Sequence, residues 1–179
     1  TFQMSETVLY LDILNFDSLY NWLKQNQANR YLSIPVSLDS EYVNDSDDSN
    51  NILSHACTLI IDNALQEVYF FDSNDLNSSD YLINKLFDRY FKDFEFKYSM
   101  GYSYIPTNKF NSLGLCLNRK FIGSCIENLG NCMILSILFP HFLHITQLTA
   151  YEGIQLLGSL NDSLLARIIN NYSVGFIIH

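Results

Sequence analysis

The stretch HACTLIIDNALQEVYFFDSN, residues 55–74, decides how this chain folds. Two runs rich in β-branched and aromatic residues, HACTLIID and EVYFFD, are joined by the short link NALQ. Such runs, separated by a few turn residues, indicate a β-hairpin of two largely buried strands. His55 opens the first run and Asp72 closes the second. Because paired antiparallel strands share their ends, we expect both residues near the same end of a sheet.

The segments before this hairpin predict a helix and an edge strand. Residues 17–28 carry apolar side chains at i, i+3 and i+4, which favours a helix capped by Asp17 or Ser18. The run RYLSIPV, residues 30–36, alternates apolar and polar positions as a strand does. Pro35 has no N–H to donate, so we expect this strand at a sheet edge or the proline at a strand end.

The rest of the chain predicts further helices around the sheet, and the whole of residues 1–179 is interpreted as one α+β domain. We expect Pro140 to kink or end the helix that contains it. The remaining expected elements are a polar loop at 39–51, a helix at 79–91, a strand in FEFKYS at 94–99, irregular chain at 99–120, and helices at 132–143, 149–159 and 161–171.

Composition and charge exclude several classes of function. The chain is 48% apolar and 16% charged, which is typical of a globular protein. A net charge of −9 argues against nucleic acid as the main partner, because phosphate binding needs clustered Lys and Arg. No apolar run reaches the roughly 18 residues that a membrane span needs. The N-terminal residues lack a basic segment and a small-residue cleavage site, so no signal peptide is expected.

The cysteine pattern argues against zinc and against a disulfide framework. The spacings contain no CxxC pair, and four cysteines are few for a chain of 179 residues. We therefore expect reduced thiols in a cytosol-like compartment, with three buried and one reactive, and no metal or cofactor. His141 and His144 could form a metal-binding pair, but ordinary helix histidines are favoured. The acidic loop at 39–51 faintly resembles a calcium site, but a solvated loop is favoured. The residues concerned are Cys57, Cys116, Cys125, Cys132, His141 and His144.

Cys132 is the candidate nucleophile. It lies in ENLGNCMILSILF, where turn-forming residues give way to an apolar, helix-like run. A helix N-terminus favours the thiolate that a cysteine nucleophile needs. Gly130 permits a tight backbone, and the amides of Asn131 and Cys132 are then candidate oxyanion donors. The alternative is a buried cysteine that begins an apolar helix and has no chemical role.

His55 and Asp72 are the candidate base and base-orienting acid. Each lies at the end of a predicted strand, where a fold can hold a side chain rigidly and still expose it. Taken alone, His55 is also compatible with an ordinary surface histidine, and Asp72 with a turn former in DSND. The predicted hairpin supports the catalytic interpretation of both residues, because it brings them to one end of the sheet.

The stretch YLSIPVSL…ILSHACTLIIDNALQEVYFFDSN…GNCMILSIL resembles the clan CE cysteine proteases. This superfamily includes SUMO-deconjugating and adenovirus-type proteases and bacterial-effector deubiquitinases. The shared pattern is an Ile-Pro strand, a His that opens a strand, an acid that closes the next, and a Cys that heads a helix. The separations of 17 and 60 residues between these positions fit the family, and the resemblance covers roughly residues 16–145. It implies a papain-like fold with a central mixed sheet flanked by helices and the catalytic Cys at a helix N-terminus.

The resemblance implies a thiol protease or isopeptidase with the triad His55, Asp72 and Cys132. Its substrate would be ubiquitin, a ubiquitin-like modifier or a viral precursor, and its location the cytoplasm or a host cell's cytosol or nucleus. A viral or bacterial effector origin fits the divergence from the family pattern. The alternatives are a binding module with a decayed site and an acetyltransferase that carries the acyl group on the same cysteine.

Two departures from the family pattern affect the site. The Trp that usually follows the catalytic His is Ala56 here, and the usual Gln six or seven residues before the Cys is replaced by Ile126 or Cys125. Asn128 is the best chemical substitute as an oxyanion donor, because a side-chain amide can donate a hydrogen bond. The loss of one such donor typically costs on the order of 10²–10³ in rate.

Overall fold

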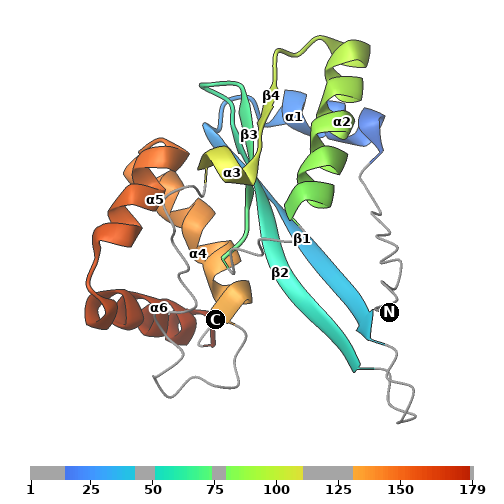
Figure 1. Cartoon of the computed structure of the whole chain (residues 1–179). Coiled ribbons are helices and arrows are strands. Elements are labelled where there is room, and N and C mark those ends of the chain that lie inside the picture. The colour runs from blue at the N-terminus through green and yellow to red at the C-terminus, as the bar shows by residue number, and fades with distance from the viewer. Residues whose placement is uncertain (1–14, 43–50, 74–79, 111–130, 178–179) are drawn as a thin grey trace.

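The computed structural model describes residues 15–42, 51–73, 80–110 and 131–177, and its architecture is α+β (Figure 1). A small mixed sheet separates two groups of helices, as expected from the sequence. In chain order the elements are α1 (Phe16–Gln25), β1 (Tyr31–Tyr42), β2 (Asn51–Asp62), β3 (Glu67–Phe71), α2 (Asp80–Tyr98), β4 (Ser103–Ile105), α3 (Thr107–Phe110), α4 (Asn131–Thr146), α5 (Ala150–Ser159) and α6 (Asp162–Ile177).

The sheet has the strand order β1-β2-β3-β4. The first two pairs are antiparallel and β3 pairs with β4 in parallel, because α2 crosses over between them. Thr58 of β2 lies opposite Phe71 of β3, which confirms the predicted hairpin. The strand at β1 is also confirmed at the sheet edge, with Pro35 inside it.

The two faces of the sheet carry separate apolar clusters. Along β2, Cys57, Leu59 and Ile61 belong to a cluster with α1 and α2, whereas Ile60 belongs to the cluster with α4, α5 and α6. This alternation follows from the two-residue period of a strand. Figure 1 shows α2 on one side of the sheet and α4, α5 and α6 on the other. The β2–β3 hairpin is therefore buried on both faces, which explains the near-continuous apolar runs in its sequence.

Helix α4 packs on the sheet in one direction, fixed by contacts along its length. Leu148 lies just beyond the C-terminal end of α4, and its carbonyl accepts a hydrogen bond from the hydroxyl of Tyr31, the first residue of β1. Further along, the rings of Phe71 and Phe139 stack with centroids 4.5 Å apart. The C-terminal end of α4 thus lies by the start of β1, and its N-terminal end points toward the opposite end of the β2–β3 hairpin.

The first helix begins earlier than the sequence predicted. Helix α1 starts at Phe16, and its N-cap is Asn15, so the predicted cap at Asp17 or Ser18 was wrong. The Asn15 side chain accepts a hydrogen bond of 2.8 Å from the Asp17 amide. Any of these side chains can cap a helix, and which one does so depends on where the chain enters it.

The predicted strand at 94–99 was wrong, because α2 continues to Tyr98. Phe87, Phe91 and Phe94 are buried at helical spacing, whereas Phe96 is 93% exposed. The local alternation of FEFKY was therefore misleading: the packing of the helical row on the sheet overrides it. The helix ends before Ser99, whose φ is +51°.

Two other expectations about element boundaries were wrong. The segment at 99–120, expected to be irregular, contains β4 and α3. Both are joined to α2 by the Asn84 side chain, which accepts hydrogen bonds from the Tyr104 hydroxyl (2.7 Å) and the Thr107 amide (3.0 Å). The predicted loop at 39–51 is shorter, because β1 extends to Tyr42 and β2 begins at Asn51. The residues of this loop that faintly resemble a calcium site, Asp45, Asp47 and Ser49, lie outside the described residues.

Pro140 does not end its helix, because α4 continues to Thr146. The helix is held by the burial of Phe139 and Leu143 on either side of the proline. On the far side, a Cβ on Gly153 of α5 would lie 2.4 Å from Leu143 Cδ2, so the two helices are in close contact. Tertiary packing here outweighs the cost of an interior proline.

In the described part of the chain, no single helix has the length and hydropathy of a membrane span. Residues Met133–Thr146 and Ala150–Ser159 reach such values only when taken together, and the two segments are bent by 111° relative to one another.

A buried carboxylate organises the turn between β2 and β3. The side chain of Asp62 is fully buried, and its Oδ1 accepts from the amides of Ala64 (2.9 Å) and Leu65 (3.2 Å). Its Oδ2 pairs with Arg30 Nη2 at 3.2 Å. These bonds raise the pKa of Arg30, whose guanidinium also donates to the Gln147 carbonyl after α4.

We expect Asp62→Ala to lower the free energy of unfolding by about 2–4 kcal/mol, because it leaves Arg30 and two turn amides without their acceptor. Urea unfolding followed by circular dichroism measures the change. Asp88→Ala is the matched control, since Asp88 pairs with Lys92 on an exposed helix face. It should cost less than about 0.5 kcal/mol. Equal effects of the two substitutions would contradict this role of Asp62.

Candidate active site

Asp72 follows the last residue of β3 and is 2% exposed. The adjacent Ser73 lies in a turn and is 1% exposed. A carboxylate whose only role is to form a surface turn would keep its solvent, whereas a buried carboxylate needs a donor or a cation. Burial therefore favours a specific partner for Asp72 over the simple turn-former interpretation.

His55 lies within β2, opposite Leu38 of β1, and β2 already begins at Asn51, so the expectation that His55 opens its strand was wrong. Because Thr58 pairs with Phe71, His55 and Asp72 both lie toward the end of the hairpin opposite its turn. The two backbones thus lie toward the same end of the β2–β3 hairpin, as expected, although β1 and β2 remain paired beyond His55 as far as Tyr42 and Asn51. The His55 side chain lies outside the described residues, so its contacts with Asp72 stay a prediction.

Cys132 is the second residue of α4, after Asn131. This confirms the predicted helix beginning at this point, while both side chains lie outside the described residues. Since the C-terminal end of α4 lies by the start of β1, the helix begins toward the end of the hairpin that holds His55 and Asp72. First-turn backbone amides of a helix are available to a thiolate or an oxyanion.

Asp72 follows β3 in the phase of Phe70, which belongs to the cluster facing α1 and α2. Helix α4 packs on the other face of the sheet, in the cluster that contains Ile60 and Phe71.

The other predicted site residues divide into described and undescribed ones. Cys57 is 1% exposed and is a buried free thiol, as expected for a small core residue. Four other residues of the predicted site or cysteine set lie outside the described residues. They are two cysteines expected to be buried, Cys116 and Cys125, the candidate oxyanion donor Asn128, and Gly130.

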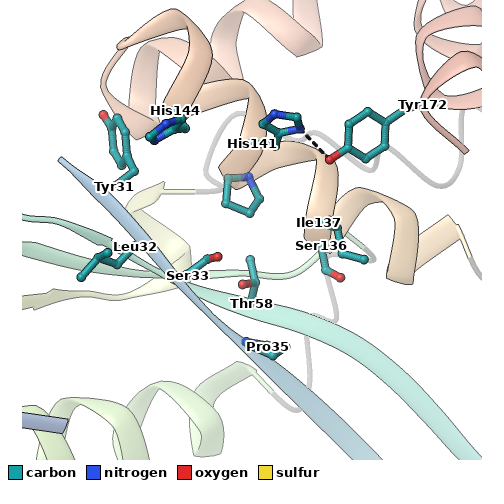
Figure 2. A pocket seen from close by; sticks show the side chains of 11 residues that line it. Tyr31, Leu32, Ser33, Pro35, Thr58, Ser136, Ile137, His141, His144 and Tyr172 are labelled. Atoms are coloured by element: carbon teal, nitrogen blue, oxygen red, sulfur yellow. Dashed lines mark hydrogen bonds between the residues drawn. The ribbon is translucent and has the colours of Figure 1, made fainter. Parts of the chain in front are cut away.

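A groove that contains none of the candidate triad residues was missed by the sequence analysis. It has a volume of about 470 Å³ and runs between β1, β2, α4 and α6 (Figure 2). No sequence motif marks it, because its walls come from four separate elements. It is lined by Tyr31, Leu32, Ser33, Pro35, Thr58, Ser136, Ile137, Pro140, His141, His144 and Tyr172.

The two histidines of α4, His141 and His144, line this groove. His141 Nδ1 lies 2.8 Å from the Tyr172 hydroxyl, an interaction drawn in Figure 2. Burial raises the pKa of Tyr172, so the hydroxyl stays protonated near neutral pH. Among the residues that the structure describes, no group of three or more His, Cys, Asp or Glu could hold a metal ion.

Comparison with protein-family models, with curated proteins and with solved structures found no match to this chain.

Proposed function

We propose that this protein is a cysteine peptidase that cleaves ubiquitin, a ubiquitin-like modifier or a related protein substrate. Cys132 is the nucleophile, His55 the general base and Asp72 the residue that orients the imidazole. The observation that carries the proposal is that the backbones of His55 and Asp72 and the first turn of α4 all lie toward the same end of the β2–β3 hairpin. The burial of Asp72 supports it further.

In this mechanism the thiolate attacks the carbonyl carbon of the scissile bond, and the imidazole gives its proton to the leaving amine. Backbone amides at the start of α4, including those of Asn131 and Cys132, would stabilise the tetrahedral oxyanion. Water then hydrolyses the thioester and restores the thiol. A side-chain donor before the helix, with Asn128 as the candidate, would complete the oxyanion site.

A non-catalytic binding module is the second candidate function. The phase of Asp72, which matches that of Phe70 on the face opposite α4, is the observation that favours it. In this case the cysteine only begins an apolar helix, and the groove beside α4 carries the binding activity.

Covalent probes distinguish the two candidates. We expect at least one propargylamide probe made from ubiquitin or a ubiquitin-like modifier to form an adduct with the wild-type protein. The adduct should be lost in Cys132→Ala and strongly slowed in His55→Ala, while Cys57→Ala keeps it. Intact-mass spectrometry measures adduct formation. Failure of the whole panel, with the protein folded, would favour the binding module.

Thiol reactivity gives a substrate-independent test of the same site. Cys132 should be alkylated by iodoacetamide near pH 7 faster than the other three cysteines, because a helix N-terminus and a nearby imidazole favour the thiolate. Cys57 is the internal control, since it is 1% exposed. Peptide mapping by mass spectrometry gives the four rates. Equal slow labelling of all four would count against a nucleophilic Cys132.

The oxyanion donor can be tested once a cleaved probe is found. Asn128→Ala should lower kcat by about 10²–10³ with little change in KM, because the hydrogen bond strengthens only in the transition state. Steady-state kinetics on that substrate measure both constants. A wild-type kcat would show that backbone amides, or another group such as Ser124, stabilise the oxyanion.

A further inference from the structure

The groove lies beside the outer edge of the sheet. β1 is the last strand on its side in the described part of the chain, and three of its residues line the groove: Tyr31, Ser33 and Pro35. Helix α4 forms the facing wall, with Ile137 among the lining residues and 43% exposed. One turn earlier on the same helix, Met133 is 58% exposed. Among the described residues, no strand pairs with the outer edge of β1, and this edge runs next to an apolar wall.

The register fixes which backbone groups of β1 point outward. The Asn63 amide donates to the Arg30 carbonyl at 2.8 Å, so position 30 directs its backbone toward β2. Backbone direction alternates along an antiparallel pair, and Ser33 and Pro35 therefore direct theirs away from β2. Pro35 fits this assignment, since an outward position loses no bond within the sheet. Ser33 thus offers an outward N–H and C=O, and Pro35 an outward C=O.

The chemistry of the groove favours a neutral, apolar side chain with polar backbone around it. Among the described residues, its lining contains no Asp, Glu, Lys or Arg. Pro35, Ile137 and Pro140 supply apolar surface, while Ser33 and His141 supply hydrogen-bonding groups. The chain as a whole has a net charge of −9, which attracts positively charged partners over a longer range.

We propose that this groove binds an extended peptide segment that adds to the edge of β1. The peptide backbone pairs with the outward groups of Ser33 and Pro35, an apolar side chain enters the groove against Ile137, and flanking Lys or Arg residues favour association. The site would serve as a docking surface for a protein partner. It goes beyond the proposed peptidase activity and holds equally for a binding module.

The test uses two fluorescein-labelled probes, Lys-Thr-Val-Phe-Val-Thr-Lys and the same peptide with Asp in place of Phe. The protein is the full chain carrying Cys132→Ala, so that binding is measured without turnover. Fluorescence anisotropy should show saturable binding of the Phe peptide below about 1 mM, and binding of the Asp peptide at least about tenfold weaker. No saturable binding of the Phe peptide in this range would overturn the proposal.

Two pairs of variants locate the binding site. Ser33→Pro removes the outward N–H and should weaken binding about tenfold, while Ser33→Ala keeps that N–H and should stay within about twofold. Ile137→Lys should weaken binding at least about tenfold, while Ile145→Lys should leave it unchanged. Ile145 is the matched control, since it is 68% exposed on the same helix and does not belong to the lining residues.

Circular dichroism confirms that each variant is folded before binding is measured. If Ser33→Pro does not fold, the Ile137→Lys and Ile145→Lys pair decides the question alone. Peptide binding that is unaffected by Ile137→Lys, or lowered equally by Ile145→Lys, would place the peptide elsewhere and overturn the proposal.

Discussion

The direction in which α4 lies on the sheet is the constraint on which the rest of the structure depends. Hydrogen bonds from Tyr31 and Arg30 reach the backbone just after the helix, at Leu148 and Gln147. The stack of Phe71 on Phe139 holds the middle of the helix against β3. Ring stacking and burial supply most of the stabilisation, while the polar contacts at the end choose between the two directions along the sheet.

This direction places two parts of α4 at different parts of the sheet. Its first turn points toward the end of the β2–β3 hairpin where Asp72 is buried. Its next turns face the β1 edge, where Ser136 and Ile137 line the groove. One helix thus connects the candidate catalytic end with the candidate docking surface. A partner bound along β1 would lie next to the start of this helix without having to contact it.

Much of the architecture could be predicted from the sequence, because the relevant signals are local. The hairpin at 55–74 is encoded by two apolar runs and a short link, and the helix at Cys132 by the change from turn residues to an apolar run. The strand predicted at FEFKYS failed because its alternation is real but is overruled by the buried helical row that ends in Phe94. Pro140 does not end its helix for a similar reason, since burial of its neighbours holds the helix together.

The geometry of the candidate site depends on information that the sequence does not carry locally. The spacing of His55 and Asp72 indicates that they share an end of the sheet, but not which face each occupies. That depends on the register of β2 against β3 and on the side from which α4 packs. The groove was missed for a related reason: residues as distant as Ser33 and Tyr172 meet only when α4 and α6 have docked.

The contact between Tyr31 and Leu148 has a consequence for how the chain acquires its structure during synthesis. The two residues are 117 positions apart, so the strands leave the ribosome long before the helices that cover one of their faces. Until α4 arrives, Ile60 and Phe71, both buried in the finished fold, have no helix to cover them. The nascent sheet therefore exposes an apolar surface that is prone to aggregation. The yield of folded protein in cells should depend on chaperones that shield such surfaces during translation.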